Sequence, residues 1–97
     1  FPDLRNNFKS NYHSFWILLK SEKDCTLLIN SLKKNNIYAY IGYVPLHTSK
    51  IGYKYNFHKF KLKNTEKYSK RILRLPFHNF LNKDDINKVC SLIKRSI

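Results

Sequence analysis

Two of the three prolines of this chain, Pro45 and Pro76, each follow an apolar run and end it. A proline ring fixes φ and removes the backbone N–H, so it continues neither a helix interior nor a central strand. We therefore expect a buried element to stop at each proline and the chain to turn outward there. His47 lies two residues after Pro45, and its predicted place is the mouth of the fold rather than the interior.

Three short segments are predicted to be strands. Residues 14–19 form a continuous apolar run, rich in aromatic and β-branched residues, that is typical of a strand covered on both faces. In residues 37–41 isoleucine and alanine alternate with tyrosine, so this second strand has two different faces, and it ends at Gly42. Residues 73–75 predict a brief third strand, which Pro76 stops.

Caps and apolar stripes predict a helix after the first strand and another at the end of the chain. Ser21, with Asp24 three residues later, is a capping-box pattern, and the asparagines at 35–36 can supply the left-handed cap at the other end. Asn82 is the predicted cap of the last helix. The stripe of the first helix is Cys25, Leu28, Ile29 and Leu32, and that of the last is Ile86, Val89, Cys90, Ile93 and Ile97.

The region between the second and third strands has no clear period. Residues 48–63 predict an irregular loop, and Thr65 can cap a short helix in which Tyr68 and Ile72 lie one turn apart. Helices and strands mixed in this order predict an α+β fold, a small antiparallel sheet with helices packed on one face. A length of 97 residues suffices for one small domain.

Composition excludes several classes of protein. With two glycines, the chain has neither a dinucleotide-binding fingerprint nor a phosphate-binding glycine loop. No apolar run approaches the roughly 20 residues that span a bilayer, and no secretory signal is expected. Cys25 and Cys90 each lie on an apolar face without a Cys-x-x-Cys pair, which predicts two buried thiols in a reducing cytoplasm rather than a disulfide.

The charge is strongly positive, with 19 Lys and Arg against six acids and a net charge of +13. Residues 50–74 hold nine basic residues, one acid (Glu66) and five aromatic residues. This pattern suits nucleic acid, since lysines neutralise phosphates and aromatic rings offer stacking faces. The favoured interpretation is a solvated loop and helix face whose aromatic residues cover the sheet, and a genome rich in AT codons also accounts for much of the lysine excess.

The four histidines show no metal-ligand spacing, and neither a Ser-His-Asp nor a Cys-His arrangement is indicated, so no catalytic or metal-binding residue is assigned. His47 differs from the other three because Pro45 fixes its position at the predicted rim of the sheet, near Tyr40 and Tyr43. A fixed histidine and tyrosine beside an open loop suit hydrogen bonding to a hydroxylated or phosphorylated ligand. A surface histidine satisfied by backbone groups is the alternative.

Several of these segments resemble one enzyme family. They are His13-Ser14-Phe15-Trp16, a capped helix ending in Asn36-Ile37, Tyr43-Val44-Pro45-Leu46-His47, Tyr68-Ser69-Lys70-Arg71-Ile72-Leu73-Arg74-Leu75-Pro76 and the capped last helix. In this order they look like the C-terminal region of the sugar aminotransferases of the DegT/DnrJ/StrS family. The closest type aminates a nucleotide-linked 4-keto-6-deoxy sugar. The resemblance runs from about residue 13 to the end of the chain.

The resemblance implies a role for the chain within a larger enzyme. Family members are fold-type-I homodimers that depend on pyridoxal phosphate (PLP), and their Schiff-base lysine lies in a large domain upstream. Residues 1–12 are then expected to be a lead-in and residues 13–97 the small C-terminal domain, without a cofactor-binding residue of its own. The expected partners are the large domain, the nucleotide sugar and an amino-acid donor, and the expected pathway is cell-surface polysaccharide or lipopolysaccharide synthesis.

The resemblance also assigns candidate substrate-binding residues. Tyr43 and His47 match the family's pattern and are expected to line the substrate cleft. Many relatives have a histidine immediately before that tyrosine, where this chain has Gly42. An exposed apolar patch is expected around Trp16, Tyr40 and Tyr43, where the large domain would pack.

Two other functions stay open at this point. One is a small basic module that binds RNA or another polyanion, although nucleic acid and membranes are not the expected partners. The other is a non-catalytic relative kept for dimerisation. Neither needs a cofactor, and a salt series of RNA binding would separate the first from the aminotransferase interpretation.

Overall fold

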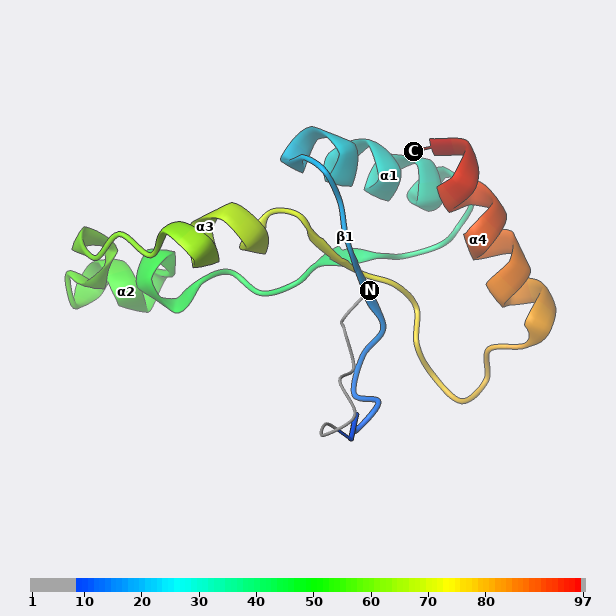
Figure 1. Cartoon of the computed structure of the whole chain (residues 1–97), viewed down its shortest axis with the longest axis horizontal. Helices are drawn as coiled ribbons and strands as arrows, with labels where there is room; N and C mark the ends of the chain where they lie inside the picture. Colours follow the sequence, from blue (N-terminus) through cyan, green and yellow to red (C-terminus); the bar gives the residue numbers. More distant parts are fainter. Residues whose placement is uncertain (1–8, 97) are drawn as a thin grey trace.

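The computed structural model describes residues 9–96 of the chain (Figure 1). Most of the predicted lead-in, residues 1–12, lies outside the described residues, as does Ile97 at the end of the last predicted stripe. Residues 9–15 contain neither helix nor strand. The elements in chain order are β1 (Trp16–Leu18), α1 (Glu22–Lys34), β2 (Tyr40–Ile41), η1 (Leu46–Thr48), α2 (Lys50–Lys54), η2 (Phe57–Lys59), α3 (Lys63–Ser69), β3 (Ile72–Arg74) and α4 (Lys83–Ser96), where η marks a 3₁₀ helix.

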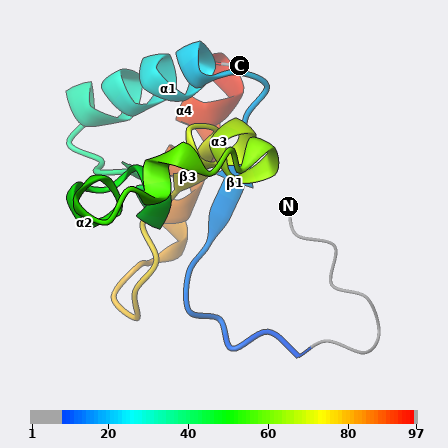
Figure 2. The same ribbon diagram turned by 90° about the vertical axis from the view of Figure 1, so that its left-hand side faces the viewer.

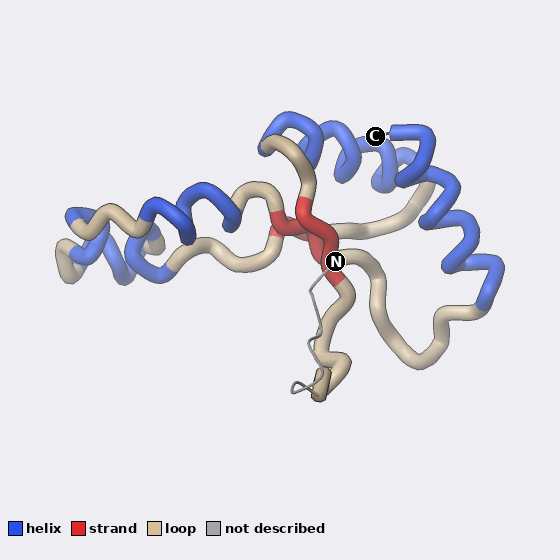
Figure 3. Tube along the Cα trace, in the orientation of Figure 1, coloured by secondary structure: helices blue, strands red, loops and turns tan. Residues whose placement is uncertain are grey.

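The three strands form one antiparallel sheet in the order β1-β3-β2. The strand that comes last in the sequence therefore lies in the middle. Figure 3 shows the strands, in red, at the junction of the helical segments. Ile17 and Ile41 are both opposite Leu73, and Trp16 and Tyr40 are both opposite Arg74. Because successive residues of a strand face opposite sides, the sheet has an Ile17–Leu73–Ile41 row on one face and a Trp16–Arg74–Tyr40 row on the other.

The core lies between the sheet and the two long helices. Leu28 and Leu32 of α1 and Leu73 of β3 are fully buried, and Leu92 and Ile93 of α4 pack against them. Helices α1 and α4 contact each other, and Figure 2 shows the C-terminal end of α4 close to α1. The α+β fold is thus confirmed: a small antiparallel sheet carries its two long helices on one face.

The predicted ends of α1 are confirmed. The Ser21 hydroxyl accepts a hydrogen bond from the Asp24 N–H at 3.1 Å and donates one to the Asp24 carboxylate at 2.8 Å. At the other end Asn36 has the left-handed φ of 59°. Its N–H donates to the Lys33 carbonyl, and the Ile37 N–H donates to the Leu32 carbonyl. This pair of bonds is a Schellman motif, which satisfies the last carbonyls of the helix.

Helix α4 begins where the caps predict but buries less of its stripe than expected. Asn82 and Asp85 cap each other, each side chain accepting from the other's backbone N–H at 2.9 and 3.1 Å. Leu92 and Ile93 are partly buried, whereas Ile86 is 49% exposed and Cys90 is also exposed. The prediction of a buried Cys90 was therefore wrong. The C-terminal half of α4 packs on α1, while the N-terminal half diverges from it (Figure 1) and borders an apolar cavity of about 220 Å³.

The region predicted as an irregular loop folds into short helices that project from the sheet (Figures 1 and 3). We call residues 46–70, which hold η1, α2, η2 and α3, the arm. Ser49 caps α2 by accepting from the Gly52 N–H at 3.1 Å, and η1, α2 and η2 contact one another. Helix α3 begins at Lys63, so Thr65 is not its cap, and Ile72 belongs to β3 rather than to the helix.

Candidate functional site

The chain leaves β2 through Tyr43, Val44 and Pro45 and passes beside α3. A cavity of about 380 Å³ lies between this segment and the helix. Three residues of α3 or its end line it, Glu66, Ser69 and Lys70, together with Tyr43 from the opposite wall. The other walls are mostly apolar. An apolar cavity with a few polar groups is typical of small-molecule sites.

Tyr43 lines this cavity and is open to solvent. Its side chain is 72% exposed, and the guanidinium of Arg74 lies 5.2 Å from the centre of its ring. A cation over an aromatic face is attracted by the ring quadrupole, so Arg74 holds the ring while the phenol group stays accessible. Arg74 itself is fixed in the middle strand of the sheet.

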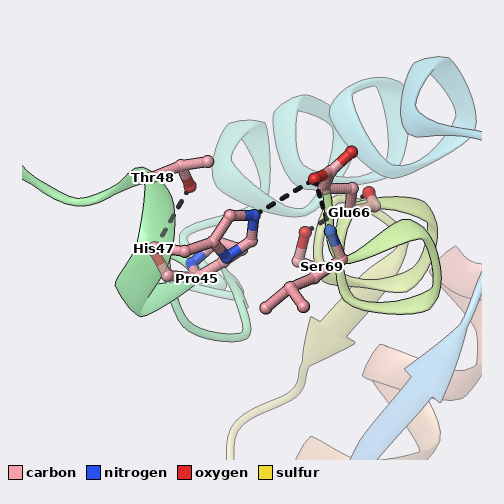
Figure 4. A network of polar contacts seen from close by, with 6 residues as sticks. Pro45, His47, Thr48, Glu66 and Ser69 are labelled. Atoms are coloured by element: carbon pink, nitrogen blue, oxygen red, sulfur yellow. Dashed lines mark hydrogen bonds and ion pairs between the residues drawn. The ribbon is translucent and has the colours of Figure 1, made fainter. Parts of the chain in front are cut away.

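His47 is not at the mouth of the fold, and the prediction that placed it there was wrong. Its side chain is only 6% exposed, because η1 turns back toward α2 and η2 and encloses the imidazole. Its Nε2 lies 3.2 Å from Oε1 of Glu66 (Figure 4). His47 does not line the cavity itself, so its link to the cavity runs through the Glu66 carboxylate.

Glu66 is a candidate residue that the sequence analysis did not single out. Its Oε1 accepts from the Leu62 N–H at 3.0 Å, in addition to its bond with His47, and the side chain is 46% exposed. Within the described part of the chain, Oε2 has no hydrogen-bond partner, so it is available to a hydroxyl group of a ligand. One feature of the sequence could have singled out Glu66, since it is the only acidic residue in residues 49–74, among nine basic residues.

One cationic side chain lines the cavity, and a second contacts the tyrosine of its wall. Lys70 lines it and pairs with Glu22 at 3.2 Å across an exposed surface, where such a pair is weak and is readily exchanged for another anion. Arg74 lies beneath Tyr43. A ligand carrying hydroxyl groups and a phosphate would thus meet an acceptor at Glu66 and cations at Lys70 and Arg74.

The surface around Trp16, Tyr40 and Tyr43 is open, but an arginine crosses it. Tyr40 is 65% and Tyr43 is 72% exposed, while Trp16 is partly buried, so the three side chains are not enclosed in a core. Arg74 stands between Trp16 and Tyr40 in the strand register. The surface therefore combines aromatic faces with a central positive charge.

Gly42, where the resemblance leads to a histidine in many relatives, is not required by the backbone. A Cβ atom there would lie 3.5 Å from Cγ2 of Ile72, an ordinary van der Waals contact. No described glycine has a positive φ. The fold therefore accepts a side chain at position 42, and one placed there would reach the same cavity as Tyr43.

The residues that line this cavity do not form a site for PLP, which needs an imine-forming lysine, an anchor for its phosphate and a partner for its ring nitrogen. At the cavity, Lys70 is paired with Glu22, and the Glu66 carboxylate is bonded to His47 and to the backbone of Leu62. We therefore assign no step through the cofactor to this chain. Within residues 9–96 there is also no group of three metal-ligating side chains.

Cys25 is not a candidate nucleophile. It is fully buried beside α1's core leucines, and this burial, followed by the nearby charge of Glu22, raises the pKa of its thiol. A thiol with a raised pKa is protonated at neutral pH and unreactive. Cys90 is exposed, and both thiols are free.

The α+β fold thus has a mostly apolar recess with a few polar groups beside Tyr43. A comparison with protein families shows that residues 2–94 match the DegT/DnrJ/EryC1/StrS aminotransferase family, and the chain belongs to this family. This membership confirms the resemblance seen in the sequence. Among residues 9–96, no helix is both long and apolar enough to cross a bilayer.

Proposed function

We propose that residues 13–97 act as the small C-terminal domain of a PLP-dependent, homodimeric aminotransferase that aminates a nucleotide-linked keto-deoxy sugar for cell-surface polysaccharide. In this proposal the large domain supplies the cofactor and its lysine, and this chain forms one wall of the substrate cleft. The observation that carries it is the recess of about 380 Å³ beside Tyr43 in a chain of an aminotransferase family.

The residues of the recess take complementary roles in this proposal. The exposed Tyr43 ring packs against the sugar or donates its phenol hydrogen to a sugar oxygen, while Glu66 accepts from a sugar hydroxyl. Lys70 and Arg74 neutralise the diphosphate. His47 is a positioning residue, since its bond to Oε1 fixes the carboxylate in one orientation. Together they hold the substrate so that its keto carbon is presented to the cofactor amine.

The test is a steady-state transamination assay of the proposed full-length aminotransferase that contains this chain. We expect Tyr43→Ala to raise KM for the nucleotide sugar about tenfold, the loss of roughly one hydrogen bond, and to leave KM for the amino donor unchanged. Tyr38→Ala is the matched control, because Tyr38 is also exposed but lies outside this cavity. If the Tyr38 variant raised KM and the Tyr43 variant did not, the proposed site would be wrong.

His47 is tested through its effect on Glu66. We expect His47→Ala to raise KM for the sugar nucleotide, and the double variant with Glu66→Ala to show no further rise, because both changes remove one oriented carboxylate. Additive effects in this cycle would mean that His47 contacts the substrate independently.

A further inference from the structure

The arm carries a concentration of positive charge that the rest of the fold does not neutralise. Residues 46–70 contain seven lysines and one acid, Glu66, whose Oε1 is already bonded to His47 and to the Leu62 N–H. Among the described residues, Lys70 is the only arm lysine in an ion pair, and its partner, Glu22, lies outside the arm. The remaining six lysines face solvent and have no carboxylate partner within residues 9–96.

The aromatic residues of the arm are exposed rather than packed over the sheet. The interpretation of residues 50–74 as a solvated face with its rings tucked beneath it was therefore wrong. Four rings are at least half exposed: Tyr53 at 58%, Tyr55 at 58%, Phe57 at 50% and Phe60 at 64%. Figures 1 and 2 show the reason, since α2 and α3 project from the sheet and cover neither of its faces.

The rings and cations are also arranged as pairs. Tyr53 stacks on His58 with the ring centres 4.3 Å apart and an interplanar angle of 13°. Lys54 lies 5.6 Å from the centre of the Tyr55 ring, and Lys67 lies 5.4 Å from that of Tyr68. An ammonium group over one of these rings places a counter-ion for a phosphate close to an aromatic ring that can stack on a base.

We propose that the arm binds single-stranded nucleic acid, which is a function beyond the sugar-nucleotide reaction. The lysines follow the phosphate backbone and the exposed rings stack on the bases. The single-stranded form fits best because the bases of a duplex are stacked on one another and present no free face to the arm. The arm holds no acid besides Glu66 that would repel the backbone.

Binding is measured by fluorescence anisotropy with the 97-residue chain and a labelled oligothymidylate of about 20 nucleotides, longer than the 4–16 nucleotides that one small fold covers. Salt is varied between about 50 and 200 mM. We expect log K to fall linearly with log salt and the oligothymidylate to bind more tightly than its duplex form or a polyphosphate of matched charge. Equal affinity for polyphosphate, or no binding at the lowest salt, would overturn the proposal.

Two charge variants locate the contact. Each replaces three exposed lysines with glutamine, so the net charge is the same in both. The arm variant changes Lys59, Lys61 and Lys63, and the control variant changes Lys34, Lys83 and Lys88 on α1 and α4. A lysine–phosphate contact contributes about 0.7 to the salt slope, so the arm variant is expected to lower the slope by about 2 and the control to leave it unchanged. Equal slopes in the two variants would overturn the assignment to the arm.

The aromatic contribution is tested at the most exposed ring of the arm. We expect Phe60→Leu to weaken oligothymidylate binding about 5-fold or more, and Phe60→Trp to preserve it, because leucine keeps the apolar surface but has no stacking face. Phe80, 90% exposed and outside the arm, gives the control Phe80→Leu, which is expected to change nothing. Circular dichroism confirms that each variant is folded, and equal affinities of the Leu and Trp variants at position 60 would exclude stacking.

Discussion

Gly52 is the position at which the arm has the least tolerance for change. It lies in α2, and a Cβ atom there would overlap the backbone carbonyl oxygens of Leu46 and His47 in η1. Backbone atoms cannot rotate away as a side chain does, so the two helices would have to separate. The change Gly52→Ala is therefore expected to loosen the arm, although alanine in place of glycine normally stabilises a helix by about 1 kcal/mol.

The magnitude follows from three contributions. Overpacking costs about 1–3 kcal/mol, and backbone overlap belongs in the upper half of that range. Displacement of η1 also weakens the hydrogen bond between His47 and Glu66, and losing such a bond costs about 0.5–1.5 kcal/mol of stability. Subtracting the helix-propensity gain of about 1 kcal/mol leaves a net loss of about 2 kcal/mol in the free energy of opening of the arm.

Native-state hydrogen exchange measures this loss locally. The N–H groups of Tyr53 and Tyr55 donate to the carbonyls of Ser49 and Ile51 in and beside α2, so they report on the arm. A loss of about 2 kcal/mol makes their exchange about 30-fold faster.

The chain supplies its own control, because Gly42 is its other glycine. At Gly42 a Cβ atom meets only the Ile72 side chain at 3.5 Å, so Gly42→Ala is expected to leave the arm unchanged. Both substitutions reduce the freedom of the unfolded chain equally, so that contribution cancels in the comparison. If the arm amides exchanged no faster in the Gly52 variant than in the Gly42 variant, the close approach of η1 and α2 would be refuted.

Three further predictions concern the thiols and the Glu66 carboxylate. A thiol reagent at neutral pH should label Cys90 in the native protein and Cys25 only after unfolding, which mass spectrometry of the labelled peptides checks; equal native labelling would contradict the burial. Burial, and after it the charge of Glu22, raises the pKa of the Cys25 thiol in the folded state. As the pH rises, the unfolded state therefore loses the thiol proton before the folded state does. The free energy of unfolding should then fall as the pH rises past about 8.5, the ordinary thiol pKa. A Cys25→Val variant that kept the same pH dependence in chemical denaturation would count against this cause. Glu66→Gln keeps one acceptor oxygen but loses the negative charge that faces His47. We expect the variant to lower the free energy of opening of the arm by about 1 kcal/mol, measured by hydrogen exchange. An unchanged free energy would show that this contact does not hold the arm.

The long helices could be predicted because their signals are local. Ser21 with Asp24 and Asn82 with Asp85 lie within one turn of each other, so each cap needs only residues that are close in the sequence. The stripe of α1 was also correct, since each of its residues packs on the sheet. In α4 the apolar stripe led to the wrong prediction that Cys90 is buried. A stripe shows which face of a helix is apolar but not over what part of its length that face packs against another element.

The arm could not be predicted because its order comes from contacts between segments. Each of its helices has seven residues or fewer, too short to be stable by propensity alone. What holds them is the fit of Gly52 against η1 and the bond from His47 to Glu66, which joins residues 19 positions apart. Neither contact can be recognised from the hydrophobic period or the helix caps of the sequence. For this reason residues 48–63 had the pattern of a loop.

The candidate site was half predictable for the same reason. Tyr43 follows a strand whose alternation is visible, so its exposure beside the sheet could be expected. His47 could not be placed, because Pro45 fixes the direction of the chain only locally, whereas the imidazole is buried by α2 and η2. The residue that lines the recess is therefore Glu66, the partner of His47, and not the histidine itself.

Glu66 joins the two surfaces for which functions are proposed. The carboxylate lines the recess beside Tyr43, and its Oε1 holds η1 against α3 within the arm. A sugar hydroxyl that bonds to Oε2 leaves the Oε1 contacts intact, so filling the recess need not disturb the arm. A ligand group that competes for Oε1 must instead release His47 and the Leu62 N–H, which frees η1 to move relative to α3. Which oxygen the ligand takes therefore determines whether the recess and the arm act independently or as one coupled unit.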